Sequence, residues 1–232
     1  MNKIIPIISV VVVVLLAGAW FALSQNTPPE VVINTATDQP TTADIKIIAF
    51  GDSLTAGFGV SQSQAYPAQL ENLLLAAGYD VQVINSGVSG ETTAGSKERA
   101  AFIAAQAADI VILGIGGNDA LRVLSIADAD ANIRTTIDTL QASAQPPVIL
   151  LLQMQAPLNA GFTYKNEFDA LYQQIADDKN LTLVPFLTEE IFFDNTNKLP
   201  DGIHYNAQGY SKVIDQHILP AVERELENLL AI

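Results

Sequence analysis

The sequence predicts an α/β fold of the flavodoxin-like type, a three-layer sandwich in which helices cover both faces of a five-stranded parallel sheet. Five short apolar runs are typical of buried strands, and segments with helical spacing of apolar residues separate them. Strands that are apolar on both faces are typical of parallel sheets between two helical layers. The chain has 232 residues, 49% of them hydrophobic, which is enough for one such domain.

The first elements follow from local pattern. Ile45–Phe50 is a short apolar run and predicts a buried strand. Tyr66–Ala77 predicts a helix, because Pro67 suits a first helical turn and Gly78 suits a helix end. Val81–Asn85 is the second predicted strand.

The middle of the chain continues the alternation of helix and strand. We predict a helix over Gly95–Ala105 and a strand over Ile110–Ile115. Ala129–Ala142 carries apolar residues at helical spacing and predicts an amphipathic helix. Val148–Met154 is a continuous apolar run and predicts the fourth strand.

The last third adds a helix, a strand and a long final helix. Tyr164–Asp178 has helical spacing of apolar residues, and Leu181–Phe186 predicts the fifth strand. Ala207–Leu230 predicts a helix, which we expect to break at Pro220. With right-handed crossovers, we expect the strands in the order 2-1-3-4-5.

Four short polar segments follow predicted strands. They are Gly51–Leu54 (GDSL), Gly87–Gly90 (GVSG), Gly116–Asp119 (GGND) and Asp201–His204 (DGIH). Open α/β sheets bind ligands beyond the carboxyl ends of their strands. In the order 2-1-3, the loop after the first strand lies between the other two. We therefore expect all four segments to meet at one site.

These segments contain the groups needed for acyl transfer by a serine nucleophile. Ser53 is the nucleophile candidate, and the Gly90 N–H and Asn118 amide are candidate oxyanion donors. Asp201 precedes His204 by three positions, a spacing that can place the carboxylate beside the imidazole. Of the two histidines, His217 has no acid at matching spacing and is interpreted as structural.

Taken singly, each segment also has a structural interpretation. Ser53 suits a helix cap, Gly90 a loop, Asn118 a turn, and Asp201 with the following glycine another turn. The chemical interpretation rests on their combination. The Gly-x-Ser-x-Gly elbow of ordinary α/β-hydrolases is absent from the sequence, which disfavours that class.

Composition narrows the function further. The formal net charge of −14 repels phosphate backbones and argues against nucleic-acid partners. With no cysteine, the chain has neither a thiol nucleophile nor a thiolate metal site. Two histidines, 13 positions apart, make a histidine-rich zinc site a poor prediction. We expect no cofactor and no metal.

At this point the sequence resembles the SGNH hydrolase superfamily, also called GDSL lipases and esterases. The match covers nearly all of residues 45–225, and the stretches Tyr164–Phe168 and Leu183–Glu190 resemble the acyl-CoA thioesterase I/lysophospholipase L1/arylesterase family within it. The resemblance implies Ser53 as nucleophile, His204 as base and Asp201 as its partner. It implies an oxyanion hole made by the N–H groups of Ser53 and Gly90 and by the Asn118 side chain.

We expect the substrate, a small acyl ester or thioester, to contact six residues: Asp52, Phe58, Leu121, Gln155, Ala156 and Pro157. The chain departs from the family pattern in two places. Tyr205 stands where relatives often have proline after the histidine. Gln155 and Ala156 stand where close relatives carry a basic and a larger aliphatic residue, so acyl-chain preference is not carried over.

The predicted function is hydrolysis of carboxylic esters or thioesters through an acyl-enzyme. One alternative is a carbohydrate O-acetyl esterase, which needs an open polar cleft instead of an apolar acyl groove. Apolar loop residues favour the groove: Phe58, Leu121, Val123, Ala156, Leu158 and Phe162. A second alternative, a catalytically silent envelope-tethered binding module, predicts a broken catalytic set, whereas this set is intact.

The first residues predict a location. Lys3 precedes the uncharged run Ile4–Leu23, which is long enough to span a bilayer. A cleaved signal peptide is the alternative, although its apolar core is usually shorter. We expect an anchor or signal peptide over residues 1–25, a flexible linker over 26–44 and a hydrolase domain over 45–232. The domain is then a monomer in the cell envelope on the extracytoplasmic side, periplasmic or secreted, and anchored in the inner membrane if the segment is retained.

Overall fold

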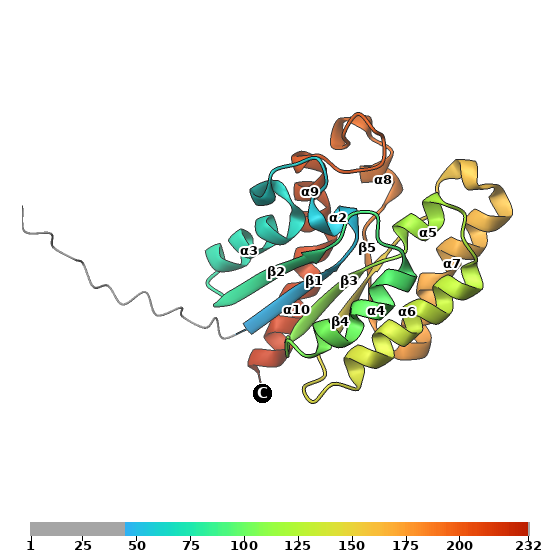
Figure 1. Ribbon diagram of the computed structural model, residues 1–232. Helices are drawn as coiled ribbons and strands as arrows, with labels where there is room; N and C mark the ends of the chain where they lie inside the picture. The colour runs from blue at the N-terminus through green and yellow to red at the C-terminus, as the bar shows by residue number, and fades with distance from the viewer. Residues whose placement is uncertain (1–44, 232) are drawn as a thin grey trace, which may run out of the picture. The chain divides into compact units, whose positions relative to one another are not determined.

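The computed structural model describes residues 45–231, so the predictions for residues 1–25 and 26–44 lie outside the described residues. A five-stranded sheet forms the centre of this part, with all paired strands parallel and in the order β2-β1-β3-β4-β5 (Figure 1). The predicted fold class and strand order are confirmed. The strands are β1 (Ile45–Gly51), β2 (Val81–Gly87), β3 (Ile110–Gly114), β4 (Val148–Gln153) and β5 (Thr182–Pro185).

Helices cover both faces of the sheet (Figure 1). One layer contains α4 (Thr93–Ala104), α6 (Ile126–Gln141) and α7 (Phe162–Lys179). The other contains α3 (Tyr66–Ala76), α9 (Ala207–Val213) and α10 (Leu219–Leu230). Between residues 45 and 231, no helix combines the length and the apolar character needed to cross a bilayer.

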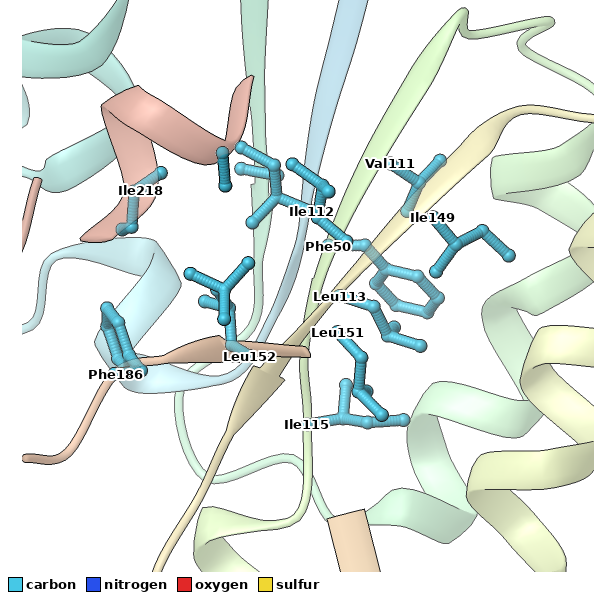
Figure 2. Packing of buried hydrophobic residues seen from close by; sticks show 14 of the residues in the cluster. Phe50, Val111, Ile112, Leu113, Ile115, Ile149, Leu151, Leu152, Phe186 and Ile218 are labelled. Atoms are coloured by element: carbon cyan, nitrogen blue, oxygen red, sulfur yellow. The ribbon is translucent and has the colours of Figure 1, made fainter. Parts of the chain in front are cut away.

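The strands are buried on both faces, as their apolar runs predict. Every residue of β3 is buried, and its side chains alternate between the two layers. Figure 2 shows Ile112 with Leu152 and Phe186 on one side of the sheet, while Leu113 lies with Phe50 on the other. Apolar area removed from water on both faces is the main stabilising contribution to this scaffold.

Three glycines form a row at the carboxyl edge of the sheet. Gly51 pairs with Gly87 on one side and with Gly114 on the other. A Cβ on Gly51 would lie 2.2 Å from Thr55 Oγ1, and one on Gly87 would lie 2.1 Å from the Ala56 nitrogen. The row therefore lets the helix that begins at Ser53 rest directly on the strand ends.

The last helix breaks earlier than predicted. A π-helical segment, η4 (Ile214–Ile218), separates α9 from α10, and Pro220 lies in the first turn of α10. The predicted break at Pro220 is therefore corrected to the turn before it. Proline has no N–H, and its ring clashes with the carbonyl four residues before it, so the helix is distorted in the turn that precedes Pro220. Proline itself is well suited to the first turn of the next helix.

Several very short helices were not predicted. Each has three to five residues, too few to show a helical period, and all belong to the loops between the main elements. They are α2 (Ser53–Ala56), η1 (Gln62–Gln64), α5 (Gly117–Leu121), η2 (Leu158–Ala160), α8 (Glu189–Phe192) and η3 (Asn195–Asn197).

Candidate active site

Ser53 is the first residue of α2, directly after β1. The preceding Asp52 caps this helix, and its Oδ1 accepts a hydrogen bond of 3.0 Å from the Leu54 N–H. The Tyr210 hydroxyl, from α9, donates a 2.8 Å hydrogen bond to the Leu54 carbonyl. The Ser53 side chain is thus held by a turn that is fixed at both its cap and its backbone.

The structure brings Ser53 together with His204 and Asp201. His204 Nε2 lies 2.8 Å from Ser53 Oγ, and His204 Nδ1 lies 2.7 Å from Asp201 Oδ2. An ionised carboxylate only accepts, so Nδ1 carries the proton and Nε2 is free to accept the Ser53 hydroxyl proton. The three side chains form one continuous hydrogen-bonded row.

Asp201 is held in place by its own turn. Its Oδ1 accepts hydrogen bonds from the N–H groups of Ile203 and His204, at 2.9 and 3.0 Å. Burial by itself raises the pKa of the Asp201 carboxyl, but the hydrogen bonds from the His204 and Ile203 backbone, and then from the His204 ring, outweigh it and lower the pKa below its ordinary value. Asp201 is therefore ionised at neutral pH and can stabilise a protonated His204.

The two other predicted groups come from the loops that flank β1. Gly90 follows β2 and has a φ of +83°, which glycine adopts readily. Asn118 lies in α5, after β3, where it is buried and its Nδ2 is 3.4 Å from Asp52 Oδ2. Gly90, Ser53 and Asn118 thus come from adjacent strand ends, as the strand order predicts.

Arg122 links these two loops and was missed by the sequence analysis. Its Nη2 donates to the Gly90 carbonyl at 2.9 Å and lies 3.5 Å from Asn118 Oδ1. Arg122 follows Asn118 by four positions, a spacing that places both on one side of a helical turn. With Oδ1 facing the guanidinium, the Asn118 Nδ2 donor points away from Arg122.

A second arginine fixes the loop that carries Gly90. Glu91 forms two hydrogen bonds of 2.7 Å with Arg99, one to Nε and one to Nη2. Arg99 Nη2 also donates to the Ser86 carbonyl at 3.1 Å, and its guanidinium stacks over the Phe50 ring. The loop is therefore fastened to the sheet on both sides of Gly90.

Asp52 is a buried acid beneath the site. Burial raises its pKa from 3.8 to about 6, against the opposing effects of the Leu54 N–H, the His204 charge and the Asn118 amide. Asp119, also buried, accepts hydrogen bonds from the Thr93 N–H and hydroxyl at 2.8 and 2.7 Å. The two carboxylates therefore brace the turns that carry Ser53 and Asn118.

A cavity of about 110 Å³ opens beside this constellation, with walls that are mainly apolar. Of the six predicted substrate contacts, Leu121, Gln155, Ala156 and Pro157 line it. Asp52 and Phe58 do not, since Asp52 is buried and the Phe58 ring packs on the His204 ring, 4.6 Å between centroids. The remaining lining residues are Leu54, Gly117, Leu158, Leu187, Phe192, Phe193, Gly202 and Ile203.

Two of the apolar loop residues that favoured an acyl groove, Val123 and Phe162, also lie outside this lining.

The wall that contains Ala156 is fixed from α7. Asp169 accepts from the Ala156 N–H at 2.8 Å, and Lys165 donates to the Ala156 carbonyl at 3.1 Å while pairing with Asp169. The backbone of this wall is therefore rigid even though its side chains are small.

Tyr205, at the usual proline position, turns into the core. Its hydroxyl donates a 2.8 Å hydrogen bond to the Phe186 carbonyl, and its ring packs edge-on against Phe186 and Phe192. Since Phe192 lines the cavity, Tyr205 joins the turn of His204 to the cavity wall. His217 lies in the π segment, where burial lowers its pKa.

A hydrogen-bonded row of serine, histidine and aspartate, at the carboxyl edge of a parallel α/β sheet, is the constellation of a serine hydrolase. Residues 49–212 match the GDSL-like lipase/acylhydrolase family, and the chain belongs to this family. The resemblance stated from the sequence is confirmed, and the protein is a serine esterase by class.

Relatives of known name support the same class. The chain is 34% identical to esterase TesA of Pseudomonas aeruginosa over 68% of this chain and 78% of that one. It is 30% identical to the arylesterase of Vibrio mimicus, with 70% and 80% covered. It is also 30% identical to thioesterase 1/protease 1/lysophospholipase L1 of Escherichia coli, with 73% and 79% covered.

Solved structures agree in fold. AlinE4, an SGNH-hydrolase family esterase, is 37% identical with a TM-score of 0.63, and 78% of this chain and 96% of that chain are covered. The crystal structure of TesA is 31% identical with a TM-score of 0.69, with 79% and 99% covered.

Proposed function

We propose that Ser53, His204 and Asp201 are the catalytic triad of this esterase. The observation that supports the proposal is the unbroken row from Ser53 Oγ through both ring nitrogens of His204 to Asp201, with contacts of 2.8 and 2.7 Å. In the described residues, the histidine that hydrogen-bonds to Ser53 is His204, whereas His217 lies in η4 and makes no hydrogen bond to Ser53.

The reaction proceeds through an acyl-enzyme. His204 Nε2 takes the hydroxyl proton while Ser53 Oγ bonds to the carbonyl carbon of the substrate. The resulting oxyanion is held by the N–H groups of Ser53 and Gly90 and by Asn118 Nδ2. The leaving alcohol or thiol departs with the proton from His204, and water, activated by the same imidazole, then releases the acid.

The apolar cavity favours an acyl chain over a sugar. Leu121, Leu187 and Phe193 give it walls that offer few hydrogen-bond partners, whereas an O-acetyl esterase for carbohydrates needs several. The names of the relatives, which include an arylesterase and a thioesterase, agree with acyl esters and thioesters as the substrate class. We therefore place the carbohydrate O-acetyl esterase second.

The N-terminal sequence supports an extracytoplasmic enzyme. The uncharged run Ile4–Leu23 after Lys3 is long enough to insert in a bilayer with the N-terminus inside. Every proposed catalytic group lies beyond Ile45. In this proposal residues 1–44 determine where the enzyme works, and the domain that follows carries the chemistry.

A fluorophosphonate probe tests the triad directly, because it reacts only with an activated serine. The full chain should be labelled, Ser53→Ala should not, and His217→Ala should be labelled as the wild type is. Labelling of Ser53→Ala would contradict the assignment. A substrate panel of p-nitrophenyl butyrate and octanoate, an acyl-CoA and an acetylated sugar then separates the two substrate classes. Preference for the acetylated sugar would favour the second candidate.

A further inference from the structure

Exposed apolar side chains occur on the segments that line the cavity and directly beside them in the sequence. We call six of them the apolar rim: Leu121, Val123, Leu124, Leu158, Phe162 and Phe193. Their exposed fractions run from 40% for Leu124 to 82% for Phe162, so each presents a large apolar surface to water. Exposed apolar side chains that cluster, unlike scattered ones, mark a contact surface.

Three of the six rim residues line the cavity, and the other three follow them closely in the sequence. Leu121, Leu158 and Phe193 line the cavity itself. The Tyr164 hydroxyl donates a 2.9 Å hydrogen bond to the Leu124 carbonyl, which ties the turn after α5 to the start of α7. The rim residues belong to α5 and the turn after it, to η2, to the first residue of α7 and to the end of α8; α5, α8 and the start of α7 lie near the end of the sheet where the strands finish (Figure 1).

Val123 holds its place in the rim at a conformational cost. It has a φ of +51°, and it is the only β-branched residue with positive φ in the described part of the chain. The hydrogen bonds from Leu124 N to the Asp119 carbonyl and from Val123 N to the Ala120 carbonyl make this turn a Schellman motif. Glycine is usual at the position of Val123, whose side chain is instead half-exposed. Neither packing nor backbone geometry explains a valine here, whereas a contact made by its side chain would.

The length and sequence of the N-terminal part indicate what the rim meets. If Ile4–Leu23 is inserted in a bilayer, residues 24–44 join it to Ile45, at the amino end of β1 and therefore at the edge of the sheet opposite the rim. Twenty-one residues reach at most about 75 Å. A domain of this size is about 40 Å across. The connection is therefore long enough for the rim to turn back to the bilayer surface.

The net charge of the chain indicates which kind of lipid surface the rim can approach. The formal net charge of −14 repels anionic lipid, so attraction by charge does not bring this face to a membrane. Burial of apolar side chains at the headgroup boundary does not depend on charge and is not screened by salt.

We propose that the apolar rim inserts shallowly into a zwitterionic phospholipid surface, so that an acyl ester passes from the lipid directly into the cavity. The proposal rests on the acyl esterase function proposed above. It adds the source of the substrate: a lipid aggregate instead of free solution. The contact requires no rearrangement of Ser53 or His204, because neither residue is part of the rim.

A fluorescent probe on the full chain tests this contact. Since the chain has no cysteine, Phe162→Cys gives a single site for an environment-sensitive nitrobenzoxadiazole dye. Phe102→Cys is the matched control, because Phe102 is a 69%-exposed phenylalanine on α4, outside the rim. Each labelled chain is reconstituted in phosphatidylcholine vesicles with and without spin-labelled lipid.

The dye at position 162 should brighten several-fold with vesicles and be quenched by the spin-labelled lipid, in low and high salt alike. The dye at position 102 should do neither. Adding Val123→Gly to the position-162 chain should reduce the brightening several-fold while raising the temperature of unfolding, because glycine relieves the strained turn. A gain in stability together with a loss of insertion excludes misfolding as the explanation.

Equal responses at positions 162 and 102 overturn the proposal. Brightening of the dye at position 162 without vesicles also overturns the proposal. If that brightening grows with protein concentration, the rim contacts a second copy of the chain. If it does not, the rim contacts the chain's own N-terminal segment. Binding to anionic vesicles alone, lost in high salt, also overturns it. Hydrolysis of p-nitrophenyl butyrate by the same chains separates the two proposals: an active chain whose dye stays in water refutes only the rim, whereas an inactive wild type refutes the esterase site.

Discussion

The two sides of the site are built in different ways. On the catalytic side, Ser53, His204 and Asp201 are held by directed hydrogen bonds; buried Asp52 caps the turn of Ser53, and Asp201 itself braces the turn of His204. On the cavity side, apolar side chains such as Leu187 and Phe193 give the space its shape, and hydrogen bonds hold only the backbone of the wall at Ala156. Hydrogen bonds fix the orientation of a group to fractions of an ångström, whereas apolar packing fixes volume and shape. We therefore expect changes on the first side to lower kcat and changes on the second to alter which acyl chain is accepted.

The largest effect should come from the catalytic side. Ser53→Ala should lower kcat/KM for p-nitrophenyl butyrate by at least about 10³-fold, because no nucleophile remains. His204→Ala should be nearly as damaging, and Asp201→Asn less so, since it disturbs the orientation and charge of the base and leaves the nucleophile in place. His217→Ala is the control, and a loss equal to that of His204→Ala would contradict the assignment of His204 as the base. Circular dichroism of each variant checks that the fold is intact.

Arg122→Met tests whether the two oxyanion loops are held together by one side chain. The substitution removes the hydrogen bonds to the Gly90 carbonyl and Asn118 Oδ1, so the two oxyanion donors, the Gly90 N–H and Asn118 Nδ2, can change orientation. We expect kcat to fall roughly 10-fold with little change in KM. Arg134→Met, which breaks ion pairs of α6 with Asp130 and Asp178, is the matched control. A rise in KM at constant kcat would assign Arg122 to substrate binding instead.

On the cavity side, Ala156→Leu should shift acyl preference. The larger side chain fills part of the cavity, so kcat/KM for p-nitrophenyl octanoate should fall about 10-fold while that for the acetate changes little. Ala101→Leu, the same change on an exposed position of α4, should alter neither rate. Equal losses on both esters would mean that the substitution disturbs the catalytic side as well.

The smallest effect concerns stability and pH. The pKa of Asp52 is raised by burial from 3.8 to about 6, so the folded state binds its proton more tightly than the unfolded state. The stability that protonated Asp52 contributes is fully present below about pH 3.8 and is lost as the pH rises through 6. Across this range the free energy of unfolding falls by at most about 3 kcal/mol from this group. Asp52→Asn should remove this loss, so the variant should keep more of its stability between pH 4.5 and 7.5 than the wild type.

Urea unfolding at both pH values measures this difference, with the exposed Asp215→Asn as the control. Parallel pH dependence of Asp52→Asn and the wild type would show that Asp52 does not titrate in this range.

Local patterns in the sequence were sufficient for the sheet. β3 is apolar throughout and β1 is apolar except for Lys46, because both faces are covered, and the glycine-rich segments after them mark the strand ends. The bounds were less accurate in the last helix, where the π segment Ile214–Ile218 results from a proline that follows it. The short helices that position Ser53 and Asn118 are stabilised by contacts with other parts of the domain, so their own sequences show no helical periodicity that would predict them.

The contacts around the site were harder to foresee, because they join residues that are distant in sequence. Arg122 reaches a carbonyl 32 positions away, and Tyr205 reaches one 19 positions away. The cavity wall from Phe192 and Phe193 depends on how α8 packs against the Tyr205 ring. Residue types alone do not state which of many possible long-range partners a side chain selects.

By itself, the sequence determined the fold class, the strand order and the segments that carry reactive groups, since these depend on burial and on the positions of strand ends. Only the tertiary structure decided that His204 meets Ser53 across 151 positions, that Arg122 joins two loops, and that Val123 adopts a positive φ with its side chain half-exposed. The physical reason is the sequence distance over which each kind of interaction acts. Periodicity and turn chemistry act over a few residues, whereas hydrogen bonds across the site and the shape of its cavity depend on the packing of the whole domain.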